Sequence, residues 1–94
     1  MITLRIEHGI ADYGAWKRAF DGDPVGRERS GVRGYRILRP VDDHDYVMID
    51  LDFDTPSQAE ALLGAMQRVW AGPARTMISG PQARITEAVE LKQY

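Results

Sequence analysis

The stretch that decides the fold is YVMIDLDFDTPSQAEALL, residues 46–63. Its first half alternates between two faces, and this period of two predicts a strand over residues 46–53. One face of that strand is apolar throughout: Val47, Ile49, Leu51 and Phe53. Thr55 is then placed to cap a helix, Pro56 to occupy its first position, and Gln58 to complete a capping box. The stretch therefore predicts a half-buried strand that leads directly into a helix.

The predicted helix carries an apolar stripe at helical spacing and ends at Gly72-Pro73. The stripe comprises Ala59, Leu62, Leu63, Met66, Val69 and Trp70. Residues 74–79 show no decisive pattern and are left open between a loop and a short helical turn. A second break at Gly80-Pro81 precedes another alternating segment, from which we predict a last strand over residues 84–91.

The N-terminal half begins with the same order of strand and helix. A first strand is predicted because alternate positions share one face: Ile2, Leu4, Ile6 and His8. Asp12 suits the cap of a helix that ends near Asp21-Gly22, with three aromatic residues at helical spacing: Tyr13, Trp16 and Phe20. Asp23-Pro24 then predicts a short second helical turn, which Gly31 would close.

Residues 32–39 are predicted to form a second strand that ends at Pro40. A short polar turn joins it to residues 46–53, which predicts an antiparallel hairpin. Two registers remain open, one with Tyr35 opposite Asp50 and one with Arg36 beside Asp50. In both registers a basic strand lies beside an acidic one.

The order strand–helix–strand–strand–helix–strand is the ferredoxin-like α+β signature. Right-handed crossovers place both helices on one face of a four-stranded antiparallel sheet. The opposite face is polar, with arginines and aspartates on neighbouring strands. Two interpretations of that face stay open: a solvated surface with cross-strand charge pairs, or the inner wall of a barrel made when two copies pack sheet to sheet.

Size and composition narrow the class of protein. Ninety-four residues are expected to form a single domain, residues 1–94. A net charge of −2 and an isoelectric point near 5.6 argue against a nucleic-acid or anionic-membrane partner. The chain has no cysteine, so disulfides and thiol chemistry are excluded. We see no signal peptide and no apolar run long enough to span a membrane, and we expect a cytoplasmic protein.

The segment DYGAWKRAFD, residues 12–21, resembles the D-Y-x-x-W-x-x-x-F-D pattern of small dimeric α/β-barrel proteins that are antibiotic-biosynthesis-monooxygenase-like or cyclase-like. Residues 31–39, residues 51–54 and Gly80-Pro81 extend the resemblance over nearly the whole chain. The resemblance implies a homodimer with facing sheets and, in each subunit, a pocket between sheet and helices. Some members oxidise aromatic molecules with oxygen and no cofactor, and others cyclise polyketides. Others degrade haem with an Asn–Trp–His set, which this chain, lacking asparagine, cannot assemble.

His8 is the candidate catalytic residue, because a strand-end histidine that points toward the helices can act as a general base. Its plainer interpretation is a histidine hydrogen-bonded to a loop. The candidate substrate-binding residues are Trp16, Tyr35, Met66 and Trp70. Tryptophans at helical spacing are more often plain core, and sheet packing would explain Tyr35 equally well. No cofactor is predicted. No metal site is predicted either, because His44 in its acidic turn is interpreted as part of a solvated hairpin tip.

Other charged residues have two interpretations as well. Asp50 and Asp52 on one strand face resemble an acid–base pair, yet arginines on the adjacent strands favour mutual neutralisation.

The sequence and the resemblance together leave two candidate functions. The first is a cofactor-independent monooxygenase-like or cyclase-like enzyme for a small aromatic or polyketide-type molecule. The second is a non-catalytic homodimer that binds a small ligand or steadies a partner protein, which a filled pocket would favour.

Overall fold

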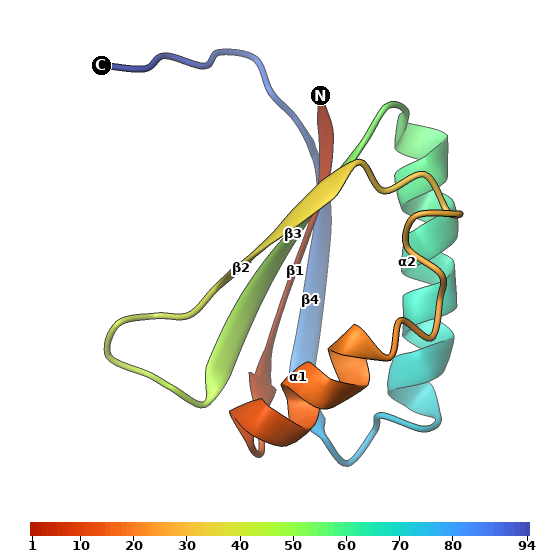
Figure 1. Cartoon of the computed structure of the whole chain (residues 1–94), viewed down its shortest axis with the longest axis vertical. Helices are drawn as coiled ribbons and strands as arrows, with labels where there is room; N and C mark the ends of the chain where they lie inside the picture. The colour runs from red at the N-terminus through yellow and green to blue at the C-terminus, as the bar shows by residue number, and fades with distance from the viewer.

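The computed structural model describes the whole chain, residues 1–94, and shows one sheet with both helices on the same face (Figure 1). The elements in chain order are β1 (Ile2–Ile10), α1 (Tyr13–Asp21), β2 (Gly34–Leu38), β3 (Tyr46–Phe53), α2 (Pro56–Ala71) and β4 (Ile78–Glu87). The four strands lie in the order β2-β3-β1-β4, and every neighbouring pair is antiparallel. The predicted ferredoxin-like α+β fold is confirmed.

The core lies between the sheet and the helices, as the strand alternation predicts. Along β1 every second residue is buried, and the same holds for the apolar face of β3. Trp16 of α1 and two residues of α2, Ala59 and Leu62, close over these strands. The buried apolar side chains of the two central strands are Ile2, Leu4, Ile6, Ile10, Val47, Ile49, Leu51 and Phe53.

Both helix starts are built as the sequence predicts. The Asp12 carboxylate accepts a hydrogen bond from the Ala15 backbone N–H at 2.8 Å. At α2 the capping box is complete: the Thr55 hydroxyl accepts from the Gln58 N–H, and the Gln58 side chain accepts from the Thr55 N–H, both at 3.3 Å. These bonds satisfy N–H groups that a helix leaves unpaired at its first turn.

The hairpin adopts one of the two registers left open. Arg36 lies opposite Asp50, and Gly34 lies opposite Asp52. Tyr35 is therefore opposite Leu51 and faces the helix side of the sheet. The strand is shorter than predicted, because it begins at Gly34 rather than at residue 32.

The short helical turn predicted after Asp23-Pro24 is present but does not become a regular helix: the Ser30 N–H bonds to the Gly26 carbonyl at 3.0 Å, and Gly31 ends the turn. Residues 22–33 form successive turns, with hydrogen bonds from Gly26 N–H to Asp23 at 3.2 Å and from Gly31 N–H to Glu28 at 3.1 Å. Gly31 has a φ of 98°, a left-handed conformation that glycine adopts without strain. The segment runs from the end of α1 along α2, where Gly31 lies against Gln58, to the start of β2 (Figure 1).

The last strand lies earlier in the chain than predicted. β4 starts at Ile78 and runs through Gly80-Pro81, where the register against β1 shifts and Gly80 takes a φ of 58°. This pair is therefore a bulge inside the strand rather than a boundary. After Glu87 the chain leaves the sheet because β1 offers no further partner, and the last bond joins Ala88 N–H to the Met1 carbonyl at 3.1 Å. Val89 and Leu91 in this tail are exposed.

The helix-free face of the sheet carries a connected set of polar side chains. Asp50 accepts hydrogen bonds from Arg5 of β1 at 2.7 and 2.8 Å and from Arg36 of β2 at 3.0 Å. Thr3 donates to Asp52 at 2.8 Å, which extends the set along β1 and β3.

No helix of the protein is long and apolar enough to cross a membrane.

Candidate functional site

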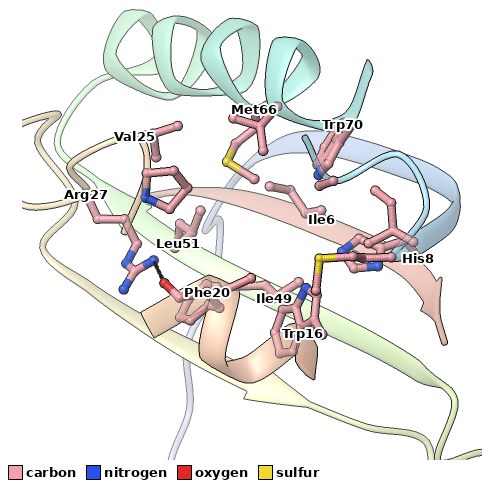
Figure 2. Close-up of a pocket in the computed structure, with 16 residues that line it drawn as sticks. Ile6, His8, Trp16, Phe20, Val25, Arg27, Ile49, Leu51, Met66 and Trp70 are labelled. Carbon is pink, nitrogen blue, oxygen red and sulfur yellow. Dashed lines mark hydrogen bonds between the residues drawn. The ribbon is translucent and has the colours of Figure 1, made fainter. Parts of the chain in front are cut away.

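A small apolar cavity lies between the sheet and the helices, with a volume of about 80 Å³ (Figure 2). Its floor comes from the central strands, through Ile6, Ile49 and Leu51. Its walls come from both helices and from the turns that follow them. The wall residues used below are Trp16, Phe20, Arg27, Met66, Trp70 and Met77.

The cavity exists because the first helix is short. α1 covers only nine residues and ends where Gly22 takes over as its C-cap. The irregular segment 22–33 completes the wall and contributes Pro24, Val25 and Arg27.

His8 stands at one end of this cavity (Figure 2). It shares the inward face of β1 and is 2% exposed. The two tryptophans lie edge-on to the imidazole, with ring centroids at 6.0 Å for Trp16 and 6.4 Å for Trp70. The imidazole, two residues before the end of β1, is thus enclosed by aromatic surface.

The hydrogen bonding of His8 defines its tautomer. Nδ1 lies 3.0 Å from the Gly9 carbonyl oxygen, which can only accept, so Nδ1 carries the hydrogen. In the neutral ring Nε2 therefore holds a lone pair. Every fully enclosed side-chain nitrogen or oxygen has a hydrogen-bond partner and Nε2 has none, so Nε2 is not fully enclosed, and His8 is one of the residues that line the cavity.

Burial lowers the pKa of His8 below its usual value, because the charged ring would lose its hydration, while the bond to Gly9 acts weakly in the opposite direction. The imidazole is consequently neutral at pH 7. A neutral imidazole whose lone pair opens onto an apolar cavity has the protonation state that a general base requires.

Four of the five predicted site residues come together. His8, Trp16, Met66 and Trp70 all line the cavity. Tyr35 does not, because β2 is an edge strand and its ring packs against the outer side of Phe20, with centroids 5.1 Å apart. Tyr35 instead lines an open polar groove, together with Asp23, Arg27, Arg33 and Asp54.

Arg27 is the cavity residue that the sequence did not single out. Its Nη1 donates to the Phe20 carbonyl oxygen at 2.8 Å, and its guanidinium carbon lies 3.9 Å from the centroid of the Phe20 ring (Figure 2). The run of five arginines from Arg27 to Arg39 was the available signal. The sequence of that run does not show which of its arginines the turns place beside the cavity.

The acidic candidates lie elsewhere. Asp50 and Asp52 face away from the cavity, on the helix-free side of the sheet. The hydrogen bond from Arg5 holds the pKa of Asp50 below its usual range, which supports the interpretation as a neutralised structural pair. His44 is exposed at the hairpin turn. No group of three or more histidine, aspartate or glutamate side chains converges to form a metal site.

The fold and the enclosed cavity define the class: a ferredoxin-like α+β protein with an apolar pocket between sheet and helices. Neither a protein-family model nor a curated protein sequence matches the chain. Solved structures do match. A variant of SnoaB, a cofactor-independent oxygenase from Streptomyces nogalater, superposes with a TM-score of 0.73 at 14% identity, covering 96% of this chain and 94% of that one.

Two further solved structures have the same fold. A candidate antibiotic biosynthesis monooxygenase from Deinococcus radiodurans has a TM-score of 0.70 at 16% identity, covering 100% of this chain and 98% of that one. A dimeric ferredoxin-like protein from an uncultured marine organism has a TM-score of 0.67 at 10% identity, covering 97% of both chains. The protein therefore has the fold of antibiotic-biosynthesis-monooxygenase-like proteins, as the resemblance of residues 12–21 implies.

Proposed function

We propose that the protein is a cofactor-independent monooxygenase-like or cyclase-like enzyme that acts on a small aromatic or polyketide-type molecule. The observation that carries the proposal is the neutral His8, whose Nε2 opens onto an apolar cavity between Trp16 and Trp70. The shared fold with a cofactor-independent oxygenase supports it.

In this proposal His8 Nε2 removes a proton from an acidic C–H or phenolic O–H of the bound substrate. The resulting carbanion or phenolate is electron-rich and reduces molecular oxygen directly. For a methylene carbon, C–O bond formation gives a peroxide, and loss of water then leaves a ketone. One oxygen atom enters the product and the other leaves as water, so the substrate itself supplies the electrons. The apolar walls exclude bulk water from the anion.

The cavity volume limits what can enter without rearrangement. At about 80 Å³ it is roughly half the size of an apolar cavity of about 150 Å³ that admits benzene. Met66 and Met77 line it, and methionine side chains rotate at low cost. A ring system would thus enter by displacing these flexible thioethers.

The same volume favours the second candidate, a non-catalytic homodimer that binds a small ligand. A cavity that remained closed to rings would leave His8 as a buried structural histidine. The two candidates differ in whether the imidazole reaches a reacting atom, so they are separable by experiment.

Both candidates include a homodimer in which the helix-free faces of two sheets meet. The ordered set of Arg5, Asp50 and Arg36 supports this arrangement, because the Asp50 carboxylate is already bonded to both arginines within one chain and would not enter an interface as an isolated charge. A structural neighbour is a dimeric ferredoxin-like protein, which supports it further.

Oxygen uptake tests the enzyme proposal. Purified protein is incubated in air with an anthrone and a hydroquinone, and wild type is compared with His8→Gln and with His44→Gln, the control at the exposed histidine. We expect uptake above buffer in wild type and His44→Gln, and a loss of roughly 100-fold in His8→Gln. No uptake, or equal uptake in His8→Gln, would reject the monooxygenase-like activity. Binding of the rings without uptake would then support the second candidate.

A further inference from the structure

The end of the cavity remote from His8 is formed by Arg27 (Figure 2). This guanidinium borders two spaces, since it lines both the apolar cavity and the open polar groove beside Asp23, Arg33 and Tyr35. Arg27 therefore stands where an apolar pocket meets solvent. A molecule that fills the cavity would place its outer end beside this cation.

Most of the hydrogen-bonding capacity of Arg27 is unused. Arginine carries five N–H donors, and the side chain makes one hydrogen bond to the protein, from Nη1 to the Phe20 carbonyl. The Asp23 carboxylate lies 3.6 Å from Nη1, within ion-pair range but beyond hydrogen-bond distance, and it accepts a hydrogen bond from the Arg27 backbone N–H at 2.8 Å. The side chain is only 15% exposed, so its free donors are held near the cavity mouth.

The guanidinium is also fixed in position. Its carbon lies 3.9 Å from the Phe20 ring centroid and 5.1 Å from that of Tyr35, within the range of cation–π attraction. Together with the bond to the Phe20 carbonyl, these contacts orient a planar fork that matches a carboxylate in geometry. The hydrogen bond to the Phe20 carbonyl, near the end of α1, uses a single N–H, so the guanidinium can still donate two parallel hydrogen bonds to a carboxylate.

We propose that Arg27 is a specificity-determining residue that binds an anionic oxygen group, best a carboxylate, at the outer end of an aromatic ligand whose ring occupies the cavity. This inference rests on the proposed function for the ring site and adds the class of ligand: an aromatic acid, with its anionic group at the end remote from His8. The apolar cavity selects the ring, and Arg27 selects the charge.

Ligand binding tests this directly, because the two tryptophans of the chain both line the cavity and their fluorescence reports its occupation. Benzoate and benzamide are matched probes that share a ring and differ in charge. We expect wild type to bind benzoate about tenfold more tightly than benzamide, the effect of one charge-assisted hydrogen bond.

Variants assign the preference to one residue. In Arg27→Met, which keeps an apolar stem, the preference for benzoate should disappear while the benzamide Kd changes less than twofold. In Arg27→Lys it should fall but persist, since an ammonium keeps the charge and loses the fork. Arg33→Met is the control, because Arg33 lies in the groove, is bonded to Asp54 and does not line the cavity. It should retain the full preference.

The outcomes separate the two proposals. Equal binding of the two probes by wild type, or an unchanged preference in Arg27→Met, overturns the role of Arg27 and leaves the ring site standing. Absence of binding by either probe rejects the ring site and this inference together. An Arg27-dependent preference without oxygen uptake by any substrate supports Arg27 and counts against the enzyme. Should Arg27→Met fail to fold, the wild-type ratio and Arg27→Lys decide.

Discussion

His8 and Gly9 are joined by a contact between neighbours in the chain: Nδ1 of the imidazole lies 3.0 Å from the Gly9 carbonyl oxygen. The contact fixes the hydrogen on Nδ1 and leaves a lone pair on Nε2 of the neutral ring. A Cβ at position 9 would collide with the Ser79 hydroxyl oxygen of β4, so a side chain at this position would require the Ser79 side chain to move.

The pH dependence of oxygen uptake should report the ionisation of His8. Because burial lowers the pKa of His8, the neutral base persists below 6.5, the usual value, and the acid limb of the profile should lie below that pH. The measurement is initial uptake rate against pH for wild type and His44→Gln, which should coincide. A limb centred above 6.5 would contradict this assignment.

Asp50→Ala should destabilise the fold by about 1–3 kcal/mol, because it removes three charge-assisted hydrogen bonds and leaves Arg5 and Arg36 without their shared partner. Urea unfolding measures the change. Asp54→Ala is the control: its partner is Arg33, the pair is largely exposed, and its loss should cost less than about 1 kcal/mol. Equal effects at the two positions would argue against a special role for Asp50.

The pH dependence of stability follows from the same aspartate. Its folded pKa lies below the usual 3.8, so its contribution is complete above pH 3.8 and is lost as the pH falls through the lower, folded value. Asp50→Asn should therefore flatten the fall in unfolding free energy in that acid range. An unchanged slope in this variant would assign the acid sensitivity to other carboxyl groups.

Met48→Lys should convert the proposed dimer into a folded monomer. Met48 lies opposite Glu7 on the helix-free side of the sheet, where a lysine is harmless in an isolated chain but would be buried between two facing sheets. Light scattering should give twice the 10.6 kDa chain mass for wild type and one chain mass for the variant. Val41→Lys, at a 98% exposed hairpin position, should stay dimeric. A wild-type particle of one chain mass would refute the dimer.

Thr55→Ala should cost about 1 kcal/mol of unfolding free energy, since it removes the oxygen that caps the Gln58 N–H at the start of α2. Thermal or urea unfolding measures it. Gln67→Ala, on the exposed side of the same helix, changes no hydrogen bond of the protein and should be nearly neutral. A loss at Gln67 as large as at Thr55 would contradict this assignment, because alanine has a higher helix propensity than glutamine and Gln67 caps no backbone group.

The fold was predictable because local signals and long-range pairing agree along most of the chain. The alternation of residues 46–53 and the capping box at Thr55 are local, and the structure uses both. The last strand was misplaced because its limits depend on another element. Val89 and Leu91 alternate correctly but find no partner, since β1 begins at Ile2, and Gly80-Pro81 is tolerated inside the strand as a bulge.

The site was predictable to the extent that it sits on regular elements. His8, Trp16, Met66 and Trp70 each point inward by strand or helix periodicity, so their meeting follows from the fold. Arg27 lies on consecutive turns, where no periodicity gives a direction, and only the folded path of residues 22–33 brings it to the cavity. Tyr35 points inward by register, but its edge strand extends beyond the space that the helices enclose.

The bulge at Gly80-Pro81 has a consequence for how copies of the chain can associate. It interrupts β4, one outer strand of the sheet, with Pro81, which has no backbone N–H to donate. The other outer strand, β2, is only five residues long and is soon followed by Pro40. Neither rim can template a long ladder with a neighbouring molecule, which protects the protein from open-ended fibrillar stacking.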